Sequence, residues 1–162
     1  MKIKKLSLAI AISSLMGLFG ADVVGQGFLK TNGGSVITCS GNKVYLEKMY
    51  NKNGSSWWLY QAMMDENKKI LFLLNALGRD VNEVLQDIEK LNTIISDYDT
   101  SNIQETMCDT QGNFEFYDVK PGKYLVGTTV EWYVGGDKQG GKIYTDFILG
   151  KKQSKTKVFI TK

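Results

Sequence analysis

The chain contains no histidine, and this limits the chemistry open to it. Histidine is the usual general base near neutral pH, the usual partner of a serine or cysteine nucleophile, and a frequent zinc ligand. Cys39 and Cys108 are the only cysteines, and neither has a histidine to activate it as a nucleophile. We therefore predict a protein that is not an enzyme, with no catalytic residue and no bound cofactor.

Carboxylates gather at Asp97, Asp99 and Glu105. Calcium prefers oxygen ligands of this kind, and a pair such as Asp97 and Glu105 has the groups that glycoside hydrolysis uses. The spacing fits no EF-hand loop, however, and nothing in it requires two carboxyl groups to face one cleft. A solvated helix end is the favoured interpretation, so no metal site is predicted and a carboxylate-based hydrolase is the least favoured function.

Large aromatic and sulfur-containing side chains are dense at Trp57, Trp58, Tyr60, Met63 and Met64. If they are buried, they pin a helical segment onto the rest of the fold, which is the more common role of such side chains. If they are exposed, they form a platform for a sugar, a peptide or a membrane surface. Both interpretations stay open, and Trp57, Trp58 and Tyr60 are the candidate contacts for a ligand or partner.

The amino terminus has the order of regions typical of a secretory signal. Residues 1–5 are basic, and the apolar run at 6–19 is shorter than the roughly 20 residues that a membrane-spanning helix needs. Cleavage after Ala21 or after Gly25 is possible, and we predict a signal peptide over residues 1–25. A retained amphipathic anchor is the alternative. The excess of lysine over arginine is typical of an AT-rich bacterial genome. Together with the signal, it predicts export to the periplasm, the cell surface or the medium.

Two cysteines in an exported chain favour a disulfide, because oxidising compartments stabilise the bridge. We predict a bond between Cys39 and Cys108; two buried thiols are the alternative. The charges, 20 basic against 17 acidic side chains, come close to balance once the predicted signal is removed. Arg79 is the only arginine, and arginine is the residue best suited to phosphate and base-edge contacts. We therefore predict no nucleic-acid partner, no transmembrane span after signal removal, and a protein or carbohydrate partner of unknown identity.

Two β-like runs precede the aromatic cluster, at residues 34–39 and 43–49, and a Ser-Gly-Asn turn separates them. They predict a hairpin or two adjacent strands. Residues 51–56 are polar and rich in turn formers. After them the apolar period changes from two to between three and four, which is the period of a helix.

This helical periodicity predicts an insertion over about residues 56–100. A first helix over 63–77 is expected to end at Gly78, because glycine accepts the left-handed conformation of a helix end. A second helix is expected to begin after Asp80 as N-cap, with Glu83 placed much as in a capping box. Its apolar face consists of Val81, Val84, Leu85, Ile88, Leu91, Ile95 and Tyr98.

Period-two alternation returns after the insertion. The four runs are 112–117, 123–134, 142–149 and 155–161. Residues 135–141 are rich in glycine and predict a flexible hairpin loop. Strands of this number need a second sheet to cover their apolar faces, so a single β-sandwich domain over residues 26–162 is predicted.

A run of turn formers and aromatic residues lies between Cys108 and Tyr124. Its order is Asp, two residues, Gly-x-Phe-x-Phe, a short spacer, and Pro-Gly-x-Tyr, and it occupies Asp109, Gly112, Phe114, Phe116, Pro121, Gly122 and Tyr124. This order resembles the signature of carboxypeptidase regulatory-like domains, which belong to the transthyretin-like (prealbumin-like) β-sandwich superfamily.

The resemblance implies a mainly β fold, an immunoglobulin-like or transthyretin-like β-sandwich with an inserted helical hairpin. In such a fold Phe114 and Phe116 enter the core, and two tight turns flank their strand, the second at Pro121 and Gly122. Proteins of this family serve as accessory, stabilising or ligand-binding modules, so the resemblance implies no particular activity. The purine-breakdown hydrolases of the superfamily rely on histidines, which this chain lacks.

Three functions follow as hypotheses. We favour an exported, non-catalytic binding or accessory protein whose specificity lies in the helical insertion, because insertions on a rigid sandwich often carry function. The alternative is a structural or assembly subunit of an envelope or surface complex, which pairs through its lysine-rich last strand. The carboxylate-based hydrolase ranks third.

Overall fold

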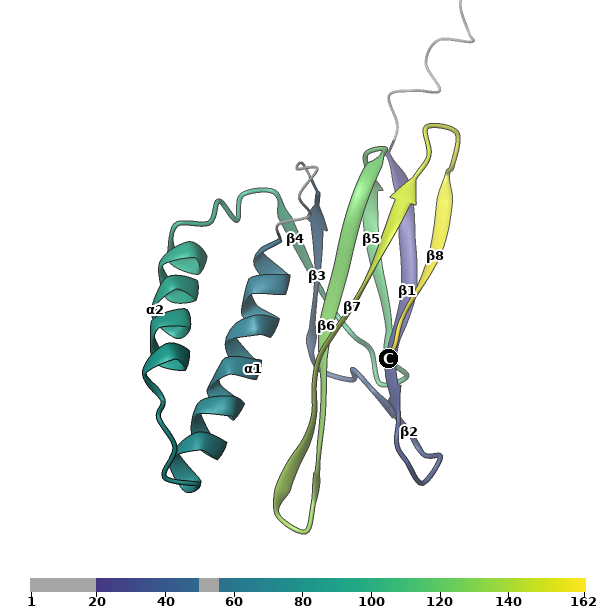
Figure 1. The fold of residues 1–162 in the computed structure, drawn as a ribbon. Helices are drawn as coiled ribbons and strands as arrows, with labels where there is room; N and C mark the ends of the chain where they lie inside the picture. Colours follow the sequence, from purple (N-terminus) through teal and green to yellow (C-terminus); the bar gives the residue numbers. More distant parts are fainter. Residues whose placement is uncertain (1–19, 50–55) are drawn as a thin grey trace, which may run out of the picture.

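Alternating apolar residues and glycine turns produce eight strands and two helices in the described residues, 20–49 and 56–162 of a computed structural model (Figure 1). In chain order the elements are β1 (Ala21–Lys30), β2 (Val36–Thr38), β3 (Lys43–Lys48), α1 (Trp57–Ala76), α2 (Asn82–Ser96), β4 (Ile103–Met107), β5 (Asn113–Val119), β6 (Gly122–Val134), β7 (Asp137–Leu149) and β8 (Lys155–Ile160). The predicted mainly β fold with an inserted helical hairpin is confirmed.

The strands form two sheets. In the first sheet β1 is central, and it pairs antiparallel with β2 and β5 and parallel with β8. The second sheet has the order β4-β3-β6-β7, with all neighbours antiparallel. Their facing side chains make one core; among the largest contributors are Val23, Leu46, Phe114, Phe116, Tyr124, Val126, Ile143 and Ile160.

Strand β1 occupies residues that the sequence assigned to the end of the signal. Ala21 and Val23 are buried in the core, and an added Cβ on Gly25 would lie 2.3 Å from the ring of Phe114. Cleavage after Gly25 would therefore remove the first half of a central strand, whereas cleavage before Ala21 would keep the strand whole. Residues 1–19 lie outside the described residues, so the signal peptide itself stays a prediction.

The predicted disulfide between Cys39 and Cys108 is confirmed, with Cα atoms 5.8 Å apart. Cys39 directly follows β2 of the first sheet, and Cys108 directly follows β4 of the second. The bond therefore links the two layers at the point where the chain turns between them. It closes a sequence separation of 69 residues, which contains the whole helical insertion.

The two predicted helices are confirmed, with different starting points. The first begins earlier than expected, at Trp57, with Ser56 as N-cap, and the chain turns after it at Gly78, where φ is +62°. The second has Val81 rather than Asp80 as N-cap, and no side chain caps it. Asp80 instead accepts a hydrogen bond from the amide of Asn82, two residues on, so it makes a local turn.

Two expectations about strand pairing were wrong. The runs at 34–39 and 43–49 do not form a hairpin or lie side by side, because β2 pairs with β1 in one sheet and β3 pairs with β4 and β6 in the other. The glycine-rich stretch at 135–141 is no long loop. β6 and β7 continue to a two-residue turn at Gly135 and Gly136, both with positive φ, as a tight hairpin requires.

The segment that carries the family resemblance behaves as expected at its first turn. Asp109 accepts hydrogen bonds from the side chain of Asn113 and from the backbone amides of Asn113 and Gln111, which lower the pKa of its carboxyl. Gly112 has a φ of +81°. Phe114 and Phe116 are buried. The second turn differs, because the residue with positive φ is Asp118 and not Gly122, which already belongs to β6.

The helical hairpin adds a third layer. It lies on the outer face of the second sheet, with α1 next to β3 and α2 on the far side of α1 (Figure 1). Leu125 and Gly127, on the outer face of β6, are buried as a result, so this strand is covered on both sides. The paired strands β6 and β7, the β6–β7 ribbon, extend past the sandwich alongside α1 (Figure 1).

Candidate functional site: a groove between the insertion and the β6–β7 ribbon

A buried carboxylate attaches the insertion to the sheet. Glu47 of β3 is only 3 % exposed. It accepts hydrogen bonds from the hydroxyl of Ser56 at 2.5 Å and from the amides of Trp57 at 3.0 Å and Trp58 at 3.4 Å. These amides belong to the first turn of α1, where helix N–H groups lack partners and the helix dipole favours a negative charge. The start of the insertion is thus fixed by a residue of the sandwich.

The other end of the insertion meets the same carboxylate. The hydroxyl of Tyr98, which follows α2, donates a hydrogen bond to Glu47 at 2.6 Å. Burial, and then this hydrogen bond to a negative acceptor, raise the pKa of the Tyr98 phenol well above its ordinary value. The phenol therefore stays protonated and keeps donating. One carboxylate holds both ends of the helical hairpin.

Aromatic rings pack beside this attachment. The ring of Tyr45 on β3 has its centroid 5.4 Å from that of Trp57 and 5.0 Å from that of Trp58. Trp58 is 2 % exposed and lies over Gly127 of β6, where an added Cβ would fall 2.2 Å from its ring nitrogen. Trp58 therefore packs against the sheet. Trp57 and Tyr60 are half-buried, and their contact with a ligand or partner stays a prediction.

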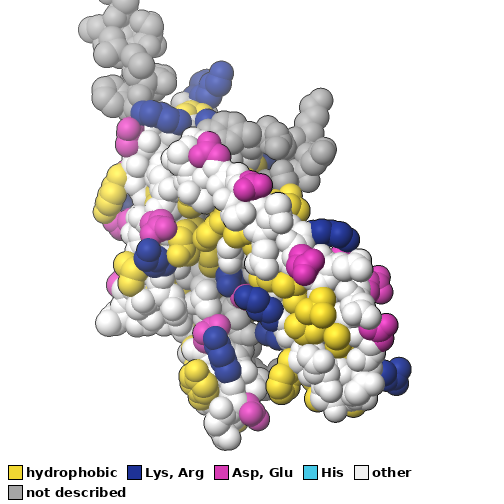
Figure 2. Space-filling model, turned by 90° about the vertical axis from the view of Figure 1, so that its left-hand side faces the viewer, with side chains coloured by type: hydrophobic (Ala, Val, Ile, Leu, Met, Phe, Trp, Pro, Cys, Tyr) yellow, Lys and Arg dark blue, Asp and Glu magenta, His cyan; other side chains and the backbone are white. Residues whose placement is uncertain are grey.

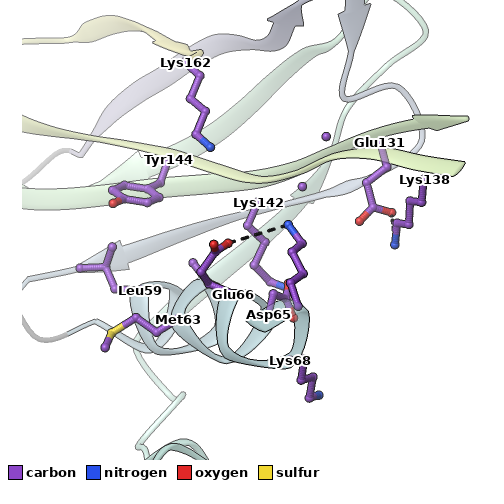
Figure 3. A pocket seen from close by; sticks show the side chains of 14 residues that line it. Leu59, Met63, Asp65, Glu66, Lys68, Glu131, Lys138, Lys142, Tyr144 and Lys162 are labelled. Carbon is purple, nitrogen blue, oxygen red and sulfur yellow. Dashed lines mark hydrogen bonds and ion pairs between the residues drawn. The ribbon is translucent and has the colours of Figure 1, made fainter. Parts of the chain in front are cut away.

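Beyond the attachment, α1 and the β6–β7 ribbon enclose a groove of about 790 Å³ (Figure 3). One wall is the helix, and the other is the face of the ribbon that points toward it. The lining residues are Leu59, Ala62, Met63, Asp65, Glu66, Lys68, Lys69, Glu131, Lys138, Gly140, Gly141, Lys142, Tyr144 and Lys162. Most of these side chains can form hydrogen bonds or carry a charge.

Three ion pairs organise the charges of the groove. Lys142 of the ribbon pairs with Asp65 of α1 and lies 5.7 Å from the centre of the Trp58 ring, so it ties the helix to the ribbon at the inner end of the groove. Glu131 and Lys138 pair across the ribbon at 2.7 Å, and the hydrogen bond to Glu131 raises the pKa of Lys138.

The third pair is the loosest. Lys69 lies 4.0 Å from Glu66, and both side chains are mostly exposed. The Lys69 ammonium would be only 3.8 Å from a Cβ added to Gly141, so it reaches toward β7 across the groove. Exposed ion pairs of this kind contribute little to stability, so a bound ion can replace one of the two partners easily.

Tyr144 and Lys162 lie together at the β7 side of the groove (Figure 3). The Tyr144 ring is half-exposed, at 47 %, and Lys162 points toward the groove from the end of the chain. No acidic partner within ion-pair distance is present for Lys162 or Lys68 in the part of the chain that the structure describes. The groove therefore combines an accessible aromatic ring with lysines that lack an ion pair.

The outer end of the insertion is apolar at its surface. Exposed apolar side chains there are Ile70, Phe72, Leu73, Leu77 and Leu85. Phe72 and Leu73 share a shallow depression with Lys68 and Lys69, so this surface adjoins the groove. Figure 2 shows hydrophobic side chains on the helical hairpin and lysine side chains in the hollow beside it.

The carboxylates considered from the sequence have separate structural partners. Asp97 is the C-cap of α2. The side chain and then the backbone amide of Ser101 hydrogen-bond to Asp99 and lower the pKa of its carboxyl. Glu105 of β4 pairs with Lys43 at 2.7 Å. Among residues 20–49 and 56–162 there is no group of three or more Cys, Asp or Glu side chains placed to hold a metal ion. No helix in these same ranges is long and apolar enough to cross a membrane.

Comparison with known proteins supports the fold and little beyond it. No protein-family model and no curated protein matches the chain. A solved structure from Pseudomonas aeruginosa, described as a candidate carbohydrate-binding protein, is similar with a TM-score of 0.51 and 14 % identity, and the match covers 93 % of each chain. The pilus backbone protein RrgB of Streptococcus pneumoniae matches with a TM-score of 0.33 and 12 % identity, over 89 % of this chain and 41 % of that one.

Proposed function

We propose that this chain is an exported, non-catalytic binding protein whose ligand lies in the groove between α1 and the β6–β7 ribbon. The observation that carries the proposal is the groove itself, about 790 Å³ and lined by polar groups from the insertion and the ribbon. Ligand sites usually occupy such concave surfaces between structural units. The helical insertion supplies one wall, in agreement with the expectation that specificity lies there.

Export is supported by two features. A basic and then apolar amino terminus has the order of a secretory signal, and the disulfide between Cys39 and Cys108 is typical of an oxidising compartment. The proposed superfamily is the transthyretin-like one, supported by the turn at Asp109 and Gly112 and by the buried Phe114 and Phe116.

Carbohydrate is the ligand class that fits the groove best. Sugars present hydroxyl groups on their edges and apolar patches on their faces, so they bind where hydrogen-bonding side chains surround an exposed aromatic ring. Tyr144 supplies the ring, while Glu66, Glu131 and Lys69 supply donors and acceptors. The similar Pseudomonas aeruginosa structure is described as a candidate carbohydrate-binding protein, which agrees with this class.

Isothermal titration calorimetry against a panel of neutral and acidic oligosaccharides tests the proposal. We expect at least one to bind, and Tyr144→Ala to weaken that binding about three- to tenfold, the size of a lost aromatic contact. Tyr117→Ala is the matched control, because Tyr117 is 65 % exposed and lies on β5 of the other sheet. Binding that is equally weakened by both substitutions would argue against the groove, and no binding by any oligosaccharide would refute the carbohydrate class.

A structural subunit is the second candidate, supported by the edge strand β8. This strand pairs only with β1 within the described ranges, and its exposed Phe159 lies under the ammonium of Lys157 at 4.9 Å. A free strand edge with an exposed aromatic ring is suited to pairing with another chain. Size-exclusion chromatography with light scattering at high protein concentration tests this: oligomers that Phe159→Lys abolishes would favour the subunit, and monomer alone would count against it.

A further inference from the structure

The charge of the groove indicates what kind of oligosaccharide it takes. Five lysines and three carboxylates line it, so the groove has a net charge of +2, against +3 for the whole chain. Three of the lysines, Lys142, Lys69 and Lys138, pair with Asp65, Glu66 and Glu131, whereas Lys68 and Lys162 have no ion pair within residues 20–49 and 56–162. Of the paired lysines, Lys69 has the loosest contact, 4.0 Å from Glu66, so a negatively charged ligand could pair with Lys69 as well as with the unpaired Lys162.

The lysines lie where a chain-like ligand would pass. Lys162 lies beside the exposed ring of Tyr144 (Figure 3). Lys69 reaches from the helix toward Gly141 of β7, because its ammonium would be 3.8 Å from a Cβ added there. A ligand with a sugar ring stacked on Tyr144 would therefore have the Lys162 ammonium beside that ring and the Lys69 ammonium on the helix wall of the same groove. An ammonium is a compact point charge, suited to a carboxylate or sulfate group and without the geometric demands of arginine.

The ribbon also gives the groove length. Tyr144 pairs with Gly127, and Tyr133 lies six residues further along β6, on the same face and opposite Lys138. Six residues of strand span about 20 Å, so this face of the ribbon continues past the groove, whose lining includes Tyr144 but not Tyr133. Tyr133 is 71 % exposed and is not needed for packing. This length suits several linked sugars better than a single one.

From these observations we infer that the ligand is an acidic oligosaccharide, whose carboxylate or sulfate groups pair with Lys69 and Lys162 while a ring stacks on Tyr144. The inference rests on the proposed function and adds the charge and the extended form of the ligand. An acidic peptide is the competing ligand. The polar groups line most of the groove, and the apolar side chains Leu59, Ala62 and Met63 come from the helix wall alone, which favours a ligand rich in hydroxyl groups.

Two matched pairs of probes test the inference. The first is oligogalacturonate and its methyl ester, and the second is sulfated dextran oligomers and unmodified dextran oligomers. Within each pair the sugar backbone is the same, and the acidic member carries negative charges that the neutral member lacks. We expect the acidic member of at least one pair to bind about fivefold or more tightly than its neutral partner, from two exposed charge contacts, and to weaken as salt is raised. Tighter binding of the acidic member in the first pair indicates that the groove takes a carboxylate, and in the second pair that it takes a sulfate.

The double variant Lys69→Gln/Lys162→Gln should remove this preference, so that the acidic and the neutral member of each pair bind to the variant with equal affinity. Lys151→Gln/Lys152→Gln removes the same charge from the exposed turn between β7 and β8 and should change nothing. Equal binding of acidic and neutral members, or a preference that survives the Lys69 and Lys162 changes, would overturn the acidic ligand while the carbohydrate function stands. Binding of a poly-glutamate peptide in the groove without any oligosaccharide binding would overturn both.

Discussion

Replacing Glu47 by alanine should release the helical insertion from the sheet. The substitution leaves the Ser56 hydroxyl, the amide of Trp57 and the Tyr98 hydroxyl without their acceptor, at distances of 2.5, 3.0 and 2.6 Å in the native protein. Hydrogen bonds to a charged group contribute about 1.5–3 kcal/mol each, but they are not additive where one side chain serves all of them. Each buried donor left without an acceptor costs about 1–3 kcal/mol, so for the three donors together we expect a loss of about 3–5 kcal/mol.

The Glu47→Ala substitution should destabilise the helical insertion more than the sandwich. The core between the two sheets contains no residue of α1 or α2, so the strands have their own packing. Hydrogen exchange read by mass spectrometry should therefore show faster exchange in α1 of Glu47→Ala, while β1 and β6 keep their protection. Urea unfolding followed by tryptophan fluorescence measures the same change, because two of the three tryptophans lie at the start of α1.

Two further variants make the prediction specific. Glu47→Gln keeps a carbonyl acceptor of the same shape without the charge, so it should fall between the native protein and Glu47→Ala. Glu105→Ala removes a carboxylate from the neighbouring strand β4 whose ion pair with Lys43 is about half exposed, and it should cost less than about 1 kcal/mol. If Glu47→Ala cost no more than Glu105→Ala, the reasoning about a shared buried acceptor would be refuted.

Three other outcomes follow from the fold. Replacing residues 56–100 by a Gly-Ser linker should leave a cooperative β-rich unfolding transition in urea, because the sandwich core excludes the helices; a molten, aggregating product would contradict this. Reducing the bond between Cys39 and Cys108 should lower stability by about 2–5 kcal/mol without changing the far-UV circular dichroism, and rapid thiol labelling of unreduced native protein would contradict the bond. Gly127→Ala should cost about 1–3 kcal/mol in thermal unfolding because its Cβ collides with Trp58, whereas Gly33→Ala, whose nearest neighbour would be 3.9 Å away, serves as control.

Much of the fold could be predicted from local patterns. The turn at Asp109, the two buried phenylalanines of β5 and the helical period of the insertion each depend on a few neighbouring residues, and all three are confirmed. The disulfide was predictable as well, because only one pairing of two cysteines exists. Strand β1 was missed, since its small apolar residues continue the apolar amino terminus without a break. Strand β4 was missed because, as an edge strand, it has no apolar alternation.

The candidate site could be predicted only in part. The aromatic cluster at the start of the insertion was visible, but the role of Glu47 was not, because a charged residue in an alternating strand indicates a solvent-facing position. It is buried only because α1 covers the outer face of its sheet. The one available signal was Tyr45, an aromatic residue on the same face of β3. The groove joins residues from α1 and from β7 that lie about 75 positions apart, as Asp65 and Lys142 do, and no local pattern relates them.

Mapping of backbone amide shifts by NMR during titration with the oligosaccharide that binds best tests the central claim most directly. The groove predicts that the largest shifts fall on two stretches, the face of α1 from Leu59 to Lys69 and the part of β7 from Gly140 to Tyr144. Smaller shifts should appear near Glu131 and Lys162. Shifts confined instead to β8 and β5 of the other sheet would contradict the claim and place the binding surface on the sandwich edge.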